Sequence, residues 1–270
     1  METGCLEELD FGEMSRLDVH GTDVEMFIAG SGAPLLYLHG IDGVEGAATF
    51  LKALSQDFTV YAPSHPGFGT SALPPHFDRV DDLGYFYLDM LDILSLDQPM
   101  IVGSSFGGWV AAEMLTKEGN RASKMVLVSP FGLKAAQRRE QYVADIFMMS
   151  RQELGANLQV STPPLGSDFP TLTALPEARL RRLMRNDEAI SHYAWTPYMS
   201  NPKLRNRLHR IHCPSLIVWG SEDSLITPAY RANFTDALPS AEISIFENAG
   251  HRVYADKPEE LAAQTAVFAN

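Results

Sequence analysis

Seven short apolar runs, separated by stretches with helical patterning, constrain the fold of this chain more than any other feature of its sequence. Three of the runs, "LLYL" (35–38), "MVLV" (125–128) and "LIVW" (216–219), are apolar on both faces of a strand. Strands have this pattern when helices cover both sides of a parallel sheet. The predicted strands are residues 23–29, 34–40, 58–63, 100–104, 124–130, 215–220 and 241–246.

Helical patterns fill most of the intervals between these runs. The predicted helices lie near residues 47–56, 80–95, 105–118, 229–238 and 256–268. Strands that alternate with helices along a chain form a mainly parallel sheet flanked by helices. We therefore predict an α/β fold.

The interval between Pro130 and Cys213 breaks this alternation, because it has helical patterning and no convincing strand. Within it, Tyr142, Ile146 and Met149 stand at positions i, i+4 and i+7. That spacing predicts a helix with a broad apolar face.

The stretch "STPPLGSDFP" (161–170) interrupts this interval, and helical patterning resumes over residues 177–195. We predict a helical cap over one edge of the sheet, at residues 131–206, on a core formed by residues 1–130 and 207–270. An ordinary crossover enlarged for packing is the alternative, and the sequence leaves it open.

Composition limits the classes of partner. The 270 residues are 45% hydrophobic and 20% charged, with a net charge of −13. Such a surface repels phosphates and anionic lipid, so neither nucleic acid nor membrane is an expected partner. The first twenty residues lack a continuous apolar core, and no apolar run is long enough to cross a bilayer. We expect a cytoplasmic protein, monomeric or homodimeric.

Metal and nucleotide motifs are weak throughout. Cys5 and Cys213 form no disulfide framework and no metal-ligand spacing. His209 and His212 form H-x-x-H without an accompanying acidic or cysteine ligand. The glycine-rich loops match neither the P-loop nor the dinucleotide fingerprint. We therefore predict no metal and no cofactor.

The stretch "GSSFG" (103–107) matches G-x-S-x-G in one frame only, with Ser105 in the centre. It follows a predicted strand and precedes a predicted helix, which is the context of a nucleophile elbow. Glycines at 103 and 107 relieve the crowding of a sharp strand-to-helix turn. An inert serine in a tight glycine turn is the alternative, and the context favours a nucleophile.

A serine nucleophile needs a base to take its proton and an acid to orient that base. Asp223 and His251 follow later strands, in the chain order serine, acid, histidine. Glu222 could compete for the acid role, and Asp223 is preferred by its place in the turn. Residues that follow parallel strands share one edge of the sheet, so these three side chains should meet there.

Acyl transfer also needs hydrogen-bond donors for the developing oxyanion. The N–H that follows the nucleophile belongs to Phe106, and the loop after an early strand, "YLHGIDG" (37–43), offers the N–H of Ile41. His39 precedes Ser105 in the chain, and we expect it to shape this loop.

The chain resembles the α/β-hydrolase superfamily, in the branch with a helical cap after the sixth strand. The resemblance covers almost the whole chain beyond the first twenty residues. Its motifs, in family order and spacing, are "LHG" (38–40), "HPGFGTS" (65–71), "GSSFGGW" (103–109), "WGSEDSLITP" (219–228) and "NAGHRVYADKPEEL" (248–261).

The resemblance implies Ser105 as nucleophile, His251 as base and Asp223 as acid, with Ile41 and Phe106 as oxyanion donors. Hydrolysis of a small to medium carboxylic ester, a small-molecule substrate, is the leading functional prediction. Aromatic residues of the predicted cap, Phe147, Trp195 and Tyr198, suggest an apolar pocket. Cap–core packing is the alternative for each of them.

Two other functions stay open. The elbow also resembles that of hydrolases that cleave carbon–carbon bonds of aromatic ring-fission products. In this chain, however, "HGIDGVEG" (39–46) replaces their Gly/Pro-rich loop, and Arg252 stands where they commonly have Trp. Their dienoate carboxylate needs a cation, which Arg181, Arg182 or Arg185 could supply. The third possibility is a ligand receptor on a hydrolase scaffold.

Overall fold

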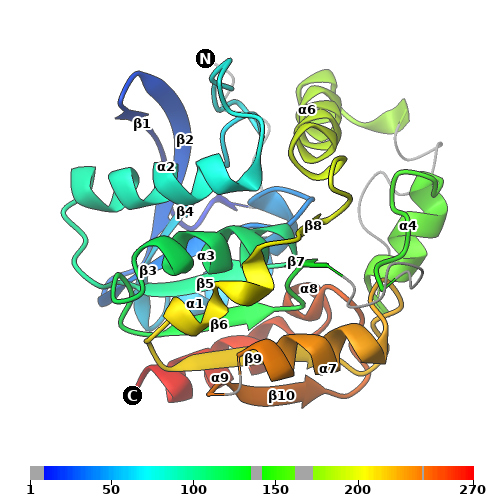
Figure 1. Ribbon diagram of the computed structural model, residues 1–270. Coiled ribbons are helices and arrows are strands. Elements are labelled where there is room, and N and C mark those ends of the chain that lie inside the picture. Colours follow the sequence, from blue (N-terminus) through cyan, green and yellow to red (C-terminus); the bar gives the residue numbers. More distant parts are fainter. Residues whose placement is uncertain (1–8, 135–141, 162–172, 239) are drawn as a thin grey trace.

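An eight-stranded sheet forms the centre of the molecule (Figure 1). The computed structural model describes residues 9–134, 142–161, 173–238 and 240–270. The strand order is β1-β2-β4-β3-β5-β6-β9-β10. Only β2 runs antiparallel to its neighbours. The strands are β1 (Glu13–Val19), β2 (Thr22–Ala29), β3 (Ala33–Leu38), β4 (Phe58–Pro63), β5 (Met100–Ser104), β6 (Met125–Val128), β9 (Ser215–Gly220) and β10 (Glu242–Phe246).

The seven predicted strands are present within a few residues of their expected bounds, and the predicted α/β fold is confirmed. β1 was missed, because five of its seven residues are exposed or polar and it shows no apolar run. It pairs with β2 in a hairpin at the edge of the sheet. Edge pairing requires backbone hydrogen bonds, and these leave no signature in the side-chain pattern.

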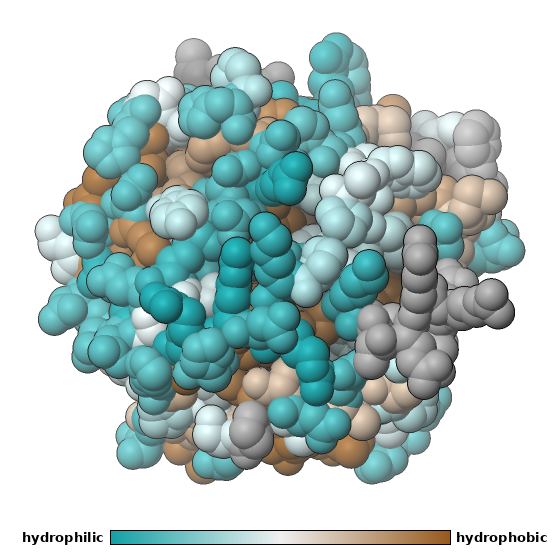
Figure 2. Space-filling model, viewed as in Figure 1, coloured by the Kyte–Doolittle hydropathy of each residue, from teal (hydrophilic) through white to brown (hydrophobic). Residues whose placement is uncertain are grey.

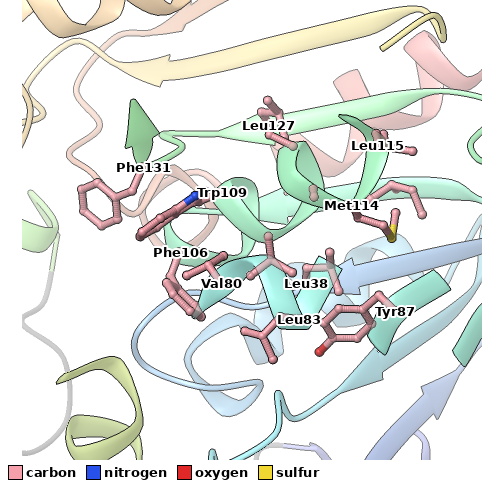
Figure 3. Packing of buried hydrophobic residues seen from close by; sticks show 14 of the residues in the cluster. Leu38, Val80, Leu83, Tyr87, Phe106, Trp109, Met114, Leu115, Leu127 and Phe131 are labelled. Carbon is pink, nitrogen blue, oxygen red and sulfur yellow. The ribbon is translucent and has the colours of Figure 1, made fainter. Parts of the chain in front are cut away.

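Helices cover both faces of the sheet. One layer contains α1 (Ala48–Leu54), α8 (Val253–Asp256) and α9 (Pro258–Ala269), and the other α2 (Val80–Ile93), α3 (Phe106–Lys117) and α7 (Pro228–Ala237). The buried strand residues alternate between the two sides, so each face of the sheet has its own apolar cluster. Figure 3 shows the cluster beneath α3, where Phe106, Trp109 and Met114 pack with Leu83 of α2 and Leu38 of β3.

The surface differs from these interiors. Hydrophilic side chains cover most of the face seen in Figure 2. Among the described residues, none of the helices combines the length and the apolar character that crossing a membrane requires.

A segment of residues 131–206, here called the inserted segment, joins β6 to β9. It contains α4 (Arg151–Leu158), α6 (Glu177–Ala194) and a two-stranded pair of β7 (Gly132–Leu133) with β8 (Ser200–Asn201). In Figure 1, α4 and α6 lie beside the sheet rather than on its helical layers. The helix predicted over 177–195 is confirmed, most of the break at 161–170 lies outside the described residues, and the division into two domains stays a prediction.

The helix predicted at Tyr142, Ile146 and Met149 is wrong, because this stretch is an extended and turning chain before α4. Its backbone is bonded instead to the loop after β9. The N–H of Ala144 donates to the carbonyl of Leu225 at 2.8 Å, and the N–H of Thr227 donates to Tyr142 at 3.0 Å. These inter-segment hydrogen bonds replace the helical ones that the periodicity suggested.

A buried ion-pair network fastens α6 to the core. The guanidinium of Arg182 donates two hydrogen bonds to the carboxylate of Glu25 on β2, at 2.8 and 2.7 Å, and also contacts Glu45. Both Arg182 and Glu25 are buried. Removal of one partner from such a pair leaves the other charge buried and uncompensated.

Replacement of Arg182 by Met should therefore lower the free energy of unfolding by about 3–5 kcal/mol, as measured by urea denaturation. Arg16 provides a control, because it also donates two hydrogen bonds to one carboxylate, that of Asp23, but at the surface. Water screens that pair, so Arg16→Met should have a much smaller effect. Equal losses in the two variants would contradict the role assigned to burial.

Candidate active site

Ser105 lies at the junction of β5 and α3, with φ 53° and ψ −113°, a left-handed conformation that L-residues seldom adopt. Glycines flank Ser105 because neighbouring backbone atoms come too close for a side chain at either position. A Cβ on Gly107 would lie 2.0 Å from the carbonyl oxygen of Leu38, and one on Gly103 would lie 2.5 Å from that of Gly107. The turn is fixed by the N–H of Ser105, which donates to Val128 at 2.7 Å. The elbow geometry predicted from the motif is therefore present.

Three of the predicted site residues meet in one hydrogen-bonded chain. Nε2 of His251 lies 2.9 Å from Oγ of Ser105, and Nδ1 lies 2.9 Å from Oδ2 of Asp223. The carboxylate accepts from Nδ1–H, which leaves Nε2 as the acceptor for the serine hydroxyl. All three side chains are buried, so water does not compete for these bonds.

The loop after β9 orients the acid. The other carboxylate oxygen of Asp223 accepts hydrogen bonds from the N–H groups of Leu225 and Ile226, at 3.0 and 3.2 Å. Glu222, the competing acid, is exposed. The structure thus brings Asp223, and not Glu222, to the histidine.

Phe131 is a site residue that the sequence analysis missed. Its ring stacks on the imidazole of His251, with 4.8 Å between centroids and 24° between planes. Phe131 follows β6 by three residues, and its N–H donates to the carbonyl of Ser105 at 3.1 Å. Its position beyond a strand end next to the elbow was the only available signal.

Two backbone N–H groups are free beside Ser105. Within the described part of the chain, neither the N–H of Ile41 nor that of Phe106 has a hydrogen-bond acceptor. Phe106 is the first residue of α3, where helix geometry leaves N–H groups unpaired. The loop that carries Ile41 is close, because a Cβ on Gly40 would lie 3.4 Å from Cβ of Ser105.

A buried histidine pair supports this loop. His39 donates from Nδ1 to the carbonyl of Gly40 at 2.7 Å and accepts at Nε2 from the N–H of His65 at 2.9 Å. His65 bonds in turn to the carbonyl of His39 and to the hydroxyl of Tyr87. Burial lowers the pKa of His39 to about 3 and that of His65 well below its usual value. Both rings are neutral and shape the loop, as expected for His39.

A cavity of about 280 Å³ opens next to Ile41 and Asp42, between the inserted segment and the core. Its lining is mainly apolar. The residues from the inserted segment are Ile146, Phe147, Met149, Arg151, Leu154, Gly155, Leu158, Leu183, Asn186, Asp187, Ile190 and Ser191. Ser105 and His251 are not among its lining residues, and the cavity borders instead the loop of Ile41 and Asp42, which approaches Ser105 at Gly40.

The three aromatic residues predicted for the pocket have different surroundings. Phe147 lines the cavity, while Trp195 and Tyr198 are not among its lining residues. Trp195 is 59% exposed and packs edge-on against Phe147 at 5.3 Å. Tyr198 donates its hydroxyl to the carbonyl of Ala144 and accepts from the N–H of Ile146 at 2.9 Å. Both rings therefore pack edge-on against Phe147.

The three arginines suggested for carboxylate binding are engaged elsewhere. Arg182 binds the carboxylates of Glu25 and Glu45. Arg185 donates to the carbonyl of Ser71 at 2.7 Å, and Arg181 pairs with Glu177. None of the three lines the cavity. Within the described residues there is also no group of three or more metal-ligand side chains.

Comparison with known proteins identifies the family. The model of the alpha/beta hydrolase family matches residues 27–264, and the chain belongs to this family. It is 30% identical over 268 residues to an uncharacterized protein of Mycobacterium tuberculosis, covering 89% of this chain and 76% of that one.

Several relatives carry functional names, among them an esterase and a carbon–carbon hydrolase. The chain is 26% identical over 257 residues to the pimeloyl-[acyl-carrier protein] methyl ester esterase of Vibrio cholerae, covering 90% of this chain and 96% of the esterase. It is 24% identical over 251 residues to the 2-hydroxy-6-oxo-6-phenylhexa-2,4-dienoate hydrolase of Burkholderia cepacia, covering 88% and 86%.

Solved structures agree on the fold. A putative lipase from Acinetobacter baumannii superposes with a TM-score of 0.79 at 18% identity, covering 96% of this chain and 91% of the lipase. The carboxylesterase CesB from Bacillus subtilis superposes with a TM-score of 0.74 at 19% identity, covering 98% and 94%. At these identities the likeness establishes the fold alone.

The lowered pKa of His39 predicts a pH dependence of stability. The unfolded ring titrates near its ordinary value of about 6.5, so below that pH the unfolded chain binds a proton that the native chain rejects. Stability therefore falls as pH falls from 6.5 towards 3. Between pH 7 and pH 5 the His39 contribution amounts to about 2 kcal/mol.

Urea denaturation of the wild type and of His39→Gln at pH 7, 6 and 5 tests this. The variant should lose less stability on acidification, by about 2 kcal/mol at pH 5. His65 remains in both proteins, and burial and its bond to Tyr87 still act on its ring. Parallel curves for the two proteins would show that His39 is protonated in the native state.

Proposed function

We propose that this protein is a serine carboxylesterase, which cleaves an uncharged ester of small to medium size. The observation that carries the proposal is the continuous hydrogen-bonded chain from Ser105 through His251 to Asp223. It ends at a serine held in the elbow conformation. A turn that served packing alone would need neither the histidine contact nor the oriented carboxylate.

The mechanism follows from these positions. His251 takes the hydroxyl proton of Ser105 through Nε2 as Oγ attacks the ester carbonyl, and Asp223 stabilises the imidazolium. The oxyanion of the tetrahedral intermediate accepts from the N–H groups of Ile41 and Phe106. His251 then protonates the departing alcohol. Water, activated by His251, hydrolyses the acyl-enzyme and restores the serine.

The cavity supports an uncharged substrate. Its wall is mainly apolar, and two carboxylates, Asp42 and Asp187, face it. Arg151, which also lines it, is paired with Asp187. Asp42 is itself paired with Arg252, so a substrate carboxylate would have to compete with Asp187 for Arg151 to gain an ion pair in this cavity. This arrangement favours an ester over a dienoate.

Carbon–carbon hydrolysis is the second candidate. The named dienoate hydrolase of Burkholderia cepacia covers most of the chain at nearly the same identity as the named esterase. The same serine–histidine chain can serve either bond. We rank this activity second because Arg151, Arg181, Arg182 and Arg185 are all bound by other groups of the protein.

Hydrolysis of p-nitrophenyl esters, from acetate to dodecanoate, tests the proposal. The wild type should turn over these esters, and Ser105→Ala should reduce kcat by about 10⁴-fold or more. Ser104→Ala is the matched control, since its hydroxyl accepts from Tyr37 at 3.1 Å and does not touch His251. It should retain activity within a few-fold.

Equal weak turnover by the wild type and Ser105→Ala would eliminate Ser105 as the esterase nucleophile. If neither protein hydrolyses any ester, dienoate cleavage by the wild type would support the second candidate. Loss of that cleavage in Ser105→Ala would assign it to the same site.

The cavity makes a separate prediction about chain length. Leu154 lines it, and Leu154→Trp should fill part of the volume. The longest ester that the wild type accepts should lose about 10-fold or more in kcat/KM, with acetate little changed. Met148→Trp is the control, because Met148 is 80% exposed and does not line the cavity. An equal loss for all esters in Leu154→Trp would place acyl binding elsewhere.

A further inference from the structure

Arg252, the residue that follows His251, is buried at the meeting point of three segments. Its Nη2 contacts the carboxylate of Asp42 and donates to the carbonyl of Gly46 at 2.9 Å. Its Nη1 donates to the side-chain carbonyl of Gln159 at 2.6 Å. One guanidinium thus joins the histidine loop, the loop of Ile41 and the chain that follows α4.

The pair with Asp42 is fixed from a second side. The hydroxyl of Tyr254 donates to the other oxygen of Asp42 at 2.9 Å, and Nε of Arg252 donates to that hydroxyl at 3.3 Å. Asp42 directly follows Ile41, the proposed oxyanion donor, on the loop that approaches Ser105 at Gly40. Each hydrogen bond to Asp42 therefore limits the motion of the proposed oxyanion donor.

Backbone contacts connect the same histidine loop to the cavity wall. The N–H of Arg252 donates to the carbonyl of Leu158 at 2.7 Å, and Leu158 lines the cavity. The carboxylate of Asp256 accepts from the N–H groups of Val160 and Ser161, at 3.1 and 2.8 Å. A Cβ on Gly250 would lie 2.9 Å from Cα of Gln159, so the two chains are in direct contact.

The charge balance shows that this arginine is committed to these partners. Its burial is offset by the carboxylate of Asp42 and by neutral acceptors, and the attraction of Asp42 keeps the pKa of Arg252 raised despite its burial. Arginine suits the position because its planar fork can bind a carboxylate and two carbonyls at once.

We propose that Arg252 is a positioning residue of the esterase site, which holds the N–H of Ile41 beside Ser105 and, through Gln159, couples that loop to the cavity wall at Leu158. This inference rests on the proposed esterase function. An acyl chain that packs against Leu158 fixes the wall, and the wall, through Arg252 and Asp42, fixes the oxyanion loop. Longer acyl chains then accelerate the chemical step as well as binding.

The kinetic test uses Arg252→Met with the p-nitrophenyl ester series. Complete loss of one oxyanion donor costs about 10²–10³-fold in kcat, and a displaced donor should cost about 10–100-fold. KM should change much less than kcat. The kcat advantage of medium-chain esters over acetate should also disappear. A role limited to packing would lower all kcat values by the same factor, and that result would overturn the coupling.

Arg252→Lys separates charge from geometry. The ammonium can reach Asp42 but cannot bind Gln159 and Gly46 at the same time. It should restore part of kcat without the chain-length advantage. Arg205→Met is the control, since Arg205 joins Leu204–Asn206 to Asn233 on α7 with similar hydrogen bonds remote from the site. It should leave kcat and its chain-length dependence unchanged.

Hydrogen–deuterium exchange tests the positioning independently of activity. In Arg252→Met, peptides that cover residues 39–47 and 155–161 should both exchange about 10-fold faster, and in Arg205→Met they should match the wild type. Unchanged exchange in Arg252→Met would overturn the proposal, even if esters are hydrolysed. If the wild type hydrolyses no ester but exchange changes as expected, the esterase function fails while the link between the loops stands.

Discussion

The left-handed backbone of Ser105 is the constraint on which the rest of the site depends. A non-glycine residue in that region costs about 1–3 kcal/mol, so the surrounding structure must hold it. The N–H of Ser105 is tied to β6, and its carbonyl accepts from Phe131 and from the first turn of α3. The same contacts place Phe131 on His251. The contacts that hold the strained backbone of Ser105 therefore also fix the ring that packs against His251.

Sheet topology explains why distant residues of the sequence meet. Ser105, Asp223 and His251 follow β5, β9 and β10, and only β6 separates β5 from β9 in the sheet. Parallel strands end at the same edge, so the three loops converge there. The intervening strand, β6, is followed by Phe131, whose ring stacks on the imidazole of His251. Residues that follow four strands, β5, β6, β9 and β10, therefore meet at this site.

The sequence predicted these features unevenly, for physical reasons. Strands buried on both faces and the glycine-flanked serine have strong local patterns, and the structure places them as expected. The stretch around Tyr142 and Ile146 has a helical pattern, but hydrogen bonds to the loop after β9 override it. Arg182 was a candidate cation for a substrate carboxylate, and only the structure shows that it binds the carboxylates of Glu25 and Glu45 instead. Contacts between distant segments decide such cases, and no local pattern encodes them.

At two places in the molecule, a buried arginine joins segments that are distant in the sequence. Arg182 joins α6 to β2, and Arg252 joins the chain after α4 to the loop of Ile41. Apolar contacts of equal area would bury surface without fixing register, because they have no preferred direction. A guanidinium bound to carboxylates and carbonyls accepts one arrangement of its partners. The inserted segment, which supplies most of the lining of the cavity, is thereby held in a defined position relative to the sheet.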